Sequence, residues 1–233
     1  MMKISPISNQ ESKSITHAAV KIGYFNAFTD NYIWFLRDDV GIIVVDPGES
    51  KLVLDYIIEN KLCLSAIILT HDHPDHIGGV ADLIAYADVP IYGTCAVATT
   101  KIIDKQHITL PFNLNAEVTF KPGHTDNSIC YLIDSREKQK HLFCGDTLFA
   151  AGCGRVFTGD YIAMYNSLKR IRALDPATLI YPAHEYTLKN LEFARFIEPN
   201  NLVVATRSEH ESRQIQKYGI TLPSNFSLVL GNS

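Results

Sequence analysis

The chain carries a dense run of metal-binding side chains directly after the apolar segment 65–69: His71, Asp72, His73, Asp75 and His76. Imidazole and carboxylate groups are ligands that suit zinc, iron or manganese. His71 and His73 are two residues apart, so an extended backbone directs both side chains the same way, while Asp72 points away from them. The turn that follows then directs Asp75 and His76 at a neighbouring point, which suits two adjacent metals better than one.

The alternative interpretation of this run is a polar loop whose histidines cap a helix that begins near Ile77. Three histidines and two aspartates within six residues, beside the end of an apolar strand, favour the metal site over that alternative.

A site for two metals needs more ligands, and three candidates lie in a similar context: His124, Asp146 and His184. Each comes just past an apolar segment that we expect to be a strand. The loops that follow these strands are therefore expected to meet the histidine run at one edge of the sheet structure.

A binuclear site of this kind typically activates water. A bound metal lowers the pKa of its water from about 15.7 to about 7, which provides hydroxide near neutrality. A carboxylate such as Asp146 can bridge two ions held roughly 3.5–4 Å apart, and a metal can also stabilise an oxyanion. No Ser-His-Asp arrangement or G-x-S-x-G motif competes for a hydrolytic role. The sequence therefore predicts a metal-dependent hydrolase.

Apolar patterns predict the elements that position these residues. We expect strands over 32–36, 41–45, 65–69, 90–92, 118–120, 129–133, 141–144 and 178–181, and helices over 52–60, 79–86 and 161–174. From 188 onward the pattern is mostly helical. Strands interleaved with helices suggest sheet layers covered by helices, and the pattern alone leaves open whether the helical end is a separate domain.

The composition fits a globular protein, with 233 residues, 46% hydrophobic and 20% charged. A net charge of −4 gives no electrostatic reason to expect nucleic acid or an anionic membrane as a partner. The first twenty residues lack the apolar core of a signal peptide, and no apolar stretch approaches the ~18 residues of a membrane span. Five cysteines without a C-x-x-C pair favour buried, reduced thiols and a cytoplasmic location. We expect 1–21 to be a disordered tail.

The spacing from His71 to His76, followed by the three later ligands, resembles the ligand set of the metallo-β-lactamase superfamily. That resemblance implies an α/β fold, an αββα sandwich with metals at one edge of the two sheets. It implies two divalent ions per chain, with zinc expected and iron or manganese as alternatives. By the same resemblance His71, His73 and His124 hold one ion, and Asp146 bridges both. The ligands implied for the second ion are Asp75, His76 and His184.

Four motifs narrow the family: FTDNYIW (28–34), CGDTLF (144–149), AGCGR (151–155) and AHEYT (183–187). They look like the hydroxyacylglutathione hydrolase (glyoxalase II) family, over about 22–225. The resemblance implies hydrolysis of S-D-lactoylglutathione to D-lactate and glutathione, in methylglyoxal detoxification. A hydroxide that bridges the metals would attack the thioester carbonyl, with Asp75 and Asp146 as the catalytic carboxylates. Thiolate is a good leaving group, so no dedicated general acid is required.

The resemblance also implies substrate contacts at Arg155, Phe157 and Tyr186. Arg155 could pair with a glutathione carboxylate, and Tyr186 could hydrogen-bond the peptide. The alternatives are a surface ion pair for Arg155 and a core tyrosine for Tyr186. The implied partner is a small glutathione thioester, and we expect a monomer. The implied organisation is a catalytic domain over 22–183 and a shortened helical substrate-binding segment over 184–233.

The chain departs from the family pattern at four places. Asp72 replaces a histidine that is not an expected ligand, 126–128 reads Asp-Asn-Ser, and Phe157 lacks the hydroxyl of the usual tyrosine. The family usually continues to a basic C-terminus that contacts glutathione, whereas this chain ends at Ser233. From these departures we expect a weakened Michaelis constant for glutathione thioesters, with the chemistry retained.

Two other classes stay open at this point. One is another enzyme on the same scaffold, such as a broad thioesterase, a lactonase or a persulfide dioxygenase with one iron. The other is a metal-binding protein without catalysis, which the complete set of seven ligands argues against.

Overall fold

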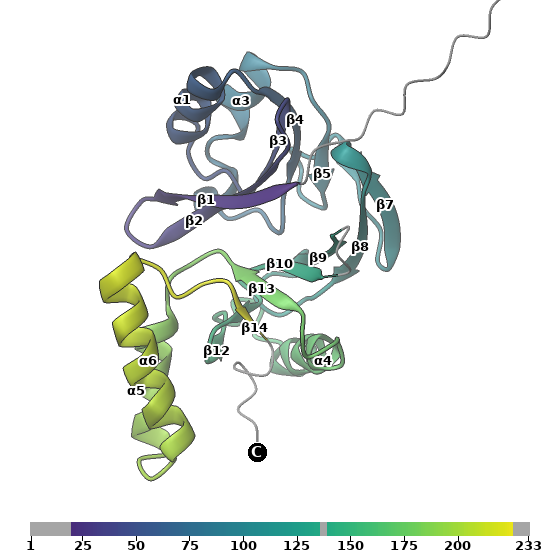
Figure 1. Ribbon diagram of the computed structural model, residues 1–233. Helices are drawn as coiled ribbons and strands as arrows, with labels where there is room; N and C mark the ends of the chain where they lie inside the picture. Colours follow the sequence, from purple (N-terminus) through teal and green to yellow (C-terminus); the bar gives the residue numbers. More distant parts are fainter. Residues whose placement is uncertain (1–19, 136–138, 226–233) are drawn as a thin grey trace, which may run out of the picture.

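The computed structural model describes residues 20–135 and 139–225, and most of their strands form two sheets that face each other (Figure 1). The expected N-terminal tail lies outside the described residues apart from 20 and 21, and so does the chain end from 226. A short third sheet pairs β11 (Leu148–Phe149) with β12 (Gly152–Cys153).

The first sheet has its strands in sequence order: β1 (Lys21–Ala27), β2 (Asn31–Arg37), β3 (Gly41–Val45), β4 (Cys63–Ile68), β5 (Ile91–Gly93) and β6 (Thr100–Lys101). The first three strands pair antiparallel, and β3 to β6 pair parallel. β3 is buried along its whole length, which explains its unbroken apolar sequence, since parallel strands are covered on both faces.

The second sheet runs in the order β14 (Ser224–Asn225), β13 (Leu179–Pro182), β10 (Lys140–Gly145), β9 (Ile129–Asp134), β8 (Leu114–Phe120) and β7 (Gln106–Leu110). Its strands pair antiparallel except β10 and β13, which are parallel. The crossover between these two strands contains α4 (Tyr161–Arg172).

Three apolar clusters define the layers. The largest fills the space between the sheets, with Trp34 and Ile68 from the first sheet and Tyr131 and Phe143 from the second. A second cluster joins the outer face of the first sheet to α1 (Lys51–Asn60) and α3 (Val80–Tyr86). The third joins the second sheet to α4. This order of layers confirms the predicted αββα sandwich (Figure 1).

The chain after β13 forms a pair of helices, α5 (Thr187–Ile197) and α6 (Leu202–Tyr218), which lie side by side (Figure 1). After α6 the chain returns to the second sheet as β14. None of the helices in the described part of the chain is long and apolar enough to cross a membrane.

Each strand and helix predicted by range has an observed counterpart, but the prediction missed the edge strands of the two large sheets, β1, β6, β7 and β14, and the short strands β11 and β12. An edge strand has one neighbour and keeps one side in solvent, so its sequence mixes polar and apolar residues. β7 alternates between exposed and partly buried positions until Leu110. Its sequence, Gln-His-Ile-Thr-Leu, therefore lacks the apolar run by which the central strands were found.

Candidate metal centre

The seven predicted ligands come together where loops of both sheets meet. The run from His71 to His76 follows β4 of the first sheet and continues into the short helix α2 (Pro74–Ile77). His124, Asp146 and His184 follow β8, β10 and β13 of the second sheet. A short isolated bridge between Asn31 and His184 joins the two sheets beside the site.

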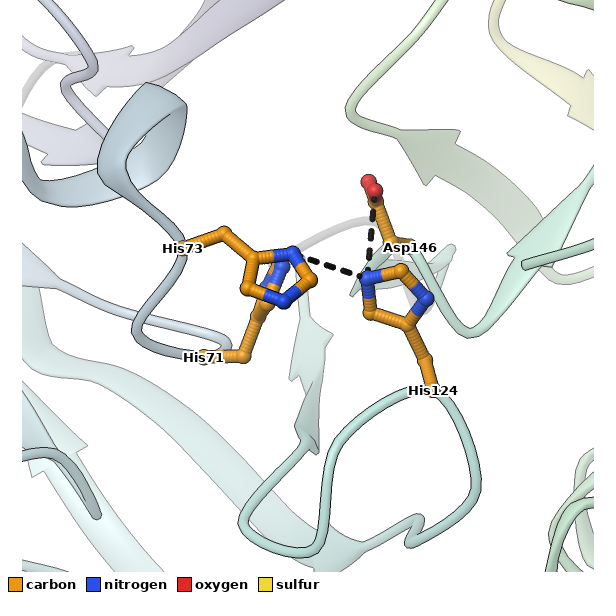
Figure 2. Close-up of side chains that lie close together, drawn as sticks. All are labelled: His71, His73, His124 and Asp146. Carbon is orange, nitrogen blue, oxygen red and sulfur yellow. Dashed lines mark hydrogen bonds and ion pairs between the residues drawn. The ribbon is translucent and has the colours of Figure 1, made fainter. Parts of the chain in front are cut away.

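Four of these residues form a first group, with potential ligand atoms within 4.8 Å of one another: His71, His73, His124 and Asp146. Figure 2 shows their side chains converging on one point. His124 Nε2 lies 3.1 Å from His73 Nδ1 and 3.5 Å from Asp146 Oδ2. Three imidazoles and a carboxylate so arranged form a suitable site for a divalent cation.

Asp75, His76 and His184 form a second group within the same limit of 4.8 Å. Asp75 Oδ2 lies 3.5 Å from the Nε2 atoms of both histidines. Asp146 faces this group too, because its Oδ1 lies 3.5 Å from His76 Nε2 and 3.3 Å from His184 Nε2. Asp146 therefore presents one carboxylate oxygen to each group, which is the arrangement expected of a carboxylate that would bind two ions at once.

The interior of the site also contains buried polar atoms without a hydrogen-bond partner in the described part of the chain. They include His71 Nε2, His76 Nε2 and Asp146 Oδ1. Such atoms are costly to bury unless something satisfies them. A divalent ion in each group would satisfy all three, so the donor set fits divalent metals.

Groups outside the cluster fix the orientation of the imidazoles. His124 Nδ1 lies 2.8 Å from the carbonyl oxygen of Arg155, and His184 Nδ1 lies 3.0 Å from Asp30 Oδ1. When Nδ1 donates to an oxygen, the lone pair is on Nε2, the atom that faces the cluster. Asn31 fixes the orientation of Asp75, because its Nδ2 donates a hydrogen bond of 2.9 Å to Asp75 Oδ2.

Asp46 contacts residues of the cluster through its carboxylate. Its carboxylate accepts hydrogen bonds from Thr70 N at 2.7 Å and Thr70 Oγ1 at 2.6 Å, and Oδ2 lies 3.2 Å from His76 Nδ1. Thr70 Oγ1 is in turn 3.0 Å from His71 Nδ1. The sequence analysis did not single out Asp46, Thr70 or Asp30 as part of the site. Asp46 follows an apolar strand just as the predicted ligands do, so the same signal was present there.

The electrostatics of the site favour the metal-binding forms of Asp146 and His71, whereas the hydrogen bond to Asp46 and the neighbouring carboxylates outweigh burial and raise the pKa of His76 to about 9. Burial alone would raise the pKa of Asp146, but the hydrogen bond from His184 and the neighbouring His76 hold that pKa well below its usual range. Burial, with the nearby His76 imidazole, lowers the pKa of His71 well below 6.5. An ionised carboxylate and a neutral imidazole are the forms that bind metal.

The three predicted substrate contacts border the cluster. The Arg155 guanidinium lies over the exposed Phe157 ring at 5.1 Å, and that ring packs edge-on against His73 and His124 at 5.4 and 5.3 Å. Tyr186 stacks on His184, with ring centroids 4.8 Å apart and planes at 10°. Arg155 is exposed and forms no ion pair with a described residue, and Tyr186 is only partly buried.

Asp72 and Asn127, two residues at which the chain departs from the family pattern, contact each other. Asp72 is exposed, and its Oδ2 accepts a hydrogen bond of 3.0 Å from Asn127 Nδ2. Asp72 belongs to neither of the two groups described above. The pair links the loop of His71 and His73 to the loop of His124.

The five cysteines are free, but only three of them are buried. Cys63 and Cys153 are exposed, so the expectation of buried thiols is wrong for these two. Cys63 begins β4 at the surface, and Cys153 lies in the short β12 hairpin, where its side chain faces away from the core.

Comparison with known proteins places these features in a family context. The model of the metallo-beta-lactamase superfamily matches residues 28–94 and 103–184. The hydroxyacylglutathione hydrolase of Haemophilus ducreyi is 46% identical over 215 residues, covering 91% of this chain and 89% of its own. That of Shewanella oneidensis is 41% identical over 218 residues, covering 87% of this chain and 80% of its own.

Solved structures agree on the fold. ETHE1 from Myxococcus xanthus is 27% identical, with a TM-score of 0.62 over 91% of this chain and 95% of its own. The BLEG-1 B3 metallo-beta-lactamase is 22% identical, with a TM-score of 0.62 over 70% of this chain and 91% of its own, a likeness of fold alone.

Proposed function

The chain belongs to the hydroxyacylglutathione hydrolase family of the metallo-β-lactamase superfamily, and from this premise we propose that it hydrolyses S-D-lactoylglutathione to D-lactate and glutathione. The observation that carries the proposal is the position of Asp146, whose two oxygens face the two ligand groups. That arrangement supports a hydrolase with two metals over a dioxygenase with one iron.

The proposed ligands follow the two groups. His71, His73 and His124 would hold one ion, Asp75, His76 and His184 would hold the other, and Asp146, which faces both groups, would be shared by the two. Zinc is the proposed metal, although iron and manganese suit the same donors. Two such ions, when bound, would lower the pKa of water to about 7 and polarise the thioester carbonyl.

The chain's own residues orient the reactants. Asp146 and Asp75 would supply negative charge to bound ions, and Asn31 fixes the orientation of Asp75 by its hydrogen bond. Arg155, Phe157 and Tyr186 line the rim, where they would bind the glutathione part of the substrate. The leaving group is a thiolate, which needs no proton donor from the protein.

The remaining parts of the proposal concern the whole chain. We propose a catalytic domain over 22–183 and a substrate-binding segment from 184, supported by the place of Tyr186 directly before α5. A monomer in the cytoplasm is proposed as well. The free cysteines support a reducing compartment, where glutathione is abundant.

The test is a steady-state assay of S-D-lactoylglutathione hydrolysis by protein whose metal content has been measured. We expect turnover with two metals per chain and no oxygen consumption. His73→Ala should lose metal and reduce kcat by at least about a hundredfold, on the scale seen when catalytic centres lose a component. His107→Ala, which changes an exposed histidine in β7, is the matched control. Wild-type turnover and two bound metals in His73→Ala would refute the ligand assignment.

A further inference from the structure

Two pairs of a cation and an aromatic ring flank the candidate metal centre. On one side Arg155 lies over Phe157, whose ring packs against His73 and His124. On the other side Lys189 Nζ lies 5.7 Å from the centroid of the Tyr186 ring. Each ligand group thus borders one aromatic ring with a cation above it, and among these four residues only Lys189 has no role implied by the family resemblance.

The Tyr186 ring connects Lys189 to the metal centre. It stacks on His184 at 4.8 Å, and it meets the Phe149 ring edge-on at 5.0 Å. These contacts fix the plane of the ring, and Lys189 lies over it on the exposed part of α5. The ammonium group is therefore close to the rim, where a substrate bound beside Tyr186 would reach it.

Apart from its contact with the Tyr186 ring, the positive charge of Lys189 is not used by the fold. It lies in the first turn of α5, where the helix dipole favours anions over cations by about 0.3–1 kcal/mol. It is exposed and forms no ion pair with another residue in the described ranges. Its positive charge consequently remains available to a ligand.

The proposed substrate carries matching charges. A glutathione thioester has two carboxylates, one on its glycine and one on its γ-glutamyl residue. Arg155 supplies a cation for one of them, and a second cation near the other ligand group suits the other carboxylate. A long, flexible lysine side chain can follow such a carboxylate without a fixed geometry.

We propose that Lys189 is a substrate-binding residue that contacts a carboxylate of the glutathione moiety and forms, with Tyr186, a second anion-binding subsite beside the metal centre. The inference rests on the proposed function and deepens it, because it defines how the thiol part of the substrate is recognised. The metal ligands and Arg155 keep the roles proposed above.

The experiment compares Lys189→Gln, Lys189→Glu and Lys189→Arg on two substrates, S-D-lactoylglutathione and the uncharged lactoyl thioester of N-acetylcysteamine. With the glutathione thioester we expect KM to rise about threefold in Lys189→Gln and about tenfold in Lys189→Glu, with kcat nearly unchanged. Lys189→Arg should keep the wild-type KM. The effect of Lys189→Gln should shrink in 0.5 M salt, since exposed charges are screened.

The controls separate recognition from structure. Lys169→Gln, which removes an exposed lysine from the last turn of α4, should leave KM unchanged. Lys189→Gln should retain metal content and Tm, and its kcat/KM for the uncharged thioester should equal that of the wild type. An unchanged KM in Lys189→Glu, or equal losses on both substrates, would overturn the proposal for Lys189 alone. If the wild type hydrolysed the uncharged thioester but not S-D-lactoylglutathione, the proposed function itself would fail, and this inference with it.

Discussion

Asp46 combines burial, charge and an unusual backbone conformation. Its side chain is 3% exposed, and its φ of 49° lies in the left-handed region. A residue other than glycine in that region costs of order 1–3 kcal/mol and persists only where the surroundings hold it. Here the surroundings include Thr70 and His76, which take up both carboxylate oxygens. Strain of this kind is common at functional sites, and it is consistent with a role in positioning His76.

Asp46→Asn should weaken metal binding, because the amide keeps the size of the side chain and removes the anionic partner of His76. Loss of such an outer partner typically costs about 10–100-fold in metal affinity. Competition with a chromophoric chelator measures this directly. Asp55→Asn, in the exposed ion pair with Lys51 on α1, is the control and should bind metal as the wild type does. Equal affinities for the two variants would show that Asp46 does not support the site.

Lys121 is a buried cation at the end of β8, 4% exposed, with a hydrogen bond from its Nζ to Thr119 Oγ1. Burial lowers the pKa of Lys121 below its ordinary 10.5. At neutral pH the lysine is charged in both the folded and the unfolded chain, so the folded state bears the cost of the buried charge. Between the lowered pKa and 10.5, Lys121 has lost its proton in the folded chain but keeps it in the unfolded chain. The free energy of unfolding therefore rises with pH in this range.

Lys121→Met should therefore raise the free energy of unfolding at pH 7, by roughly 1 kcal/mol as for other buried charges replaced by apolar residues. The difference from the wild type should narrow as the pH approaches 10.5. Urea denaturation of both proteins at pH 7 and pH 10 measures it. If the difference in the free energy of unfolding between the two proteins were the same at pH 7 and pH 10, the charge of Lys121 would not be its cause.

At the scale of elements, the hairpin of β11 and β12 ties two ligand loops together. A Cβ atom on Gly154 would lie 1.9 Å from the carbonyl oxygen of Asp146 and 2.9 Å from His124 Nδ1. The absence of a side chain thus lets the hairpin approach Asp146 and His124, two of the proposed ligands, closely. The same loop supplies the Arg155 carbonyl that orients His124.

Gly154→Ala should displace these loops, because the new Cβ would lie 1.9 Å from the backbone oxygen of Asp146, and a backbone atom cannot move aside as a flexible side chain can. We expect a loss of about 2–4 kcal/mol in stability, within the range for overpacked sites, together with reduced metal content. Cys153→Ala, at the adjacent exposed position, is the control for the loop. Thermal unfolding and metal analysis of both variants provide the measurement, and wild-type behaviour of Gly154→Ala would contradict the close packing.

The elements predictable from sequence were those with a uniform environment. β3 and β4 lie inside the first sheet and consist of nearly continuous apolar residues, so their pattern has one interpretation. The edge strands have mixed surroundings and mixed sequences, and short strands such as β14 depend on a partner far along the chain. Tertiary pairing, which no local pattern records, decides whether such a segment is a strand.

The site was predictable for a different reason. Its ligands follow apolar strands, and the ends of those strands were visible in the sequence. The supporting residues Asp30 and Thr70 were not, because their partners His184 and Asp46 lie far from them in the sequence, and only the fold brings them together. The apposition of Asp72 and Asn127 was likewise invisible, since the two are 55 residues apart.

At the scale of the whole molecule, the metal centre joins the two sheets. His71, His73 and His76 come from the first sheet, while His124, Asp146 and His184 come from the second. Ions bound between them would crosslink the layers of the sandwich at one edge. Without ions, buried nitrogen and oxygen atoms there lack partners. The stability of the sandwich and the occupancy of the site are therefore linked.

Removing the metals with a chelator should lower Tm. A ligand present at about a thousand times its Kd stabilises the folded state by roughly 4 kcal/mol, which corresponds to about 10 °C for a chain of this size. Differential scanning calorimetry of metal-loaded and metal-free protein measures the shift, and adding zinc back should restore it. Asp146→Asn lacks the carboxylate shared by the two groups, so its Tm should respond less to zinc. If loaded and metal-free protein unfolded at the same temperature, the ions would bind the folded chain no better than the unfolded chain, and the centre would not link the two sheets.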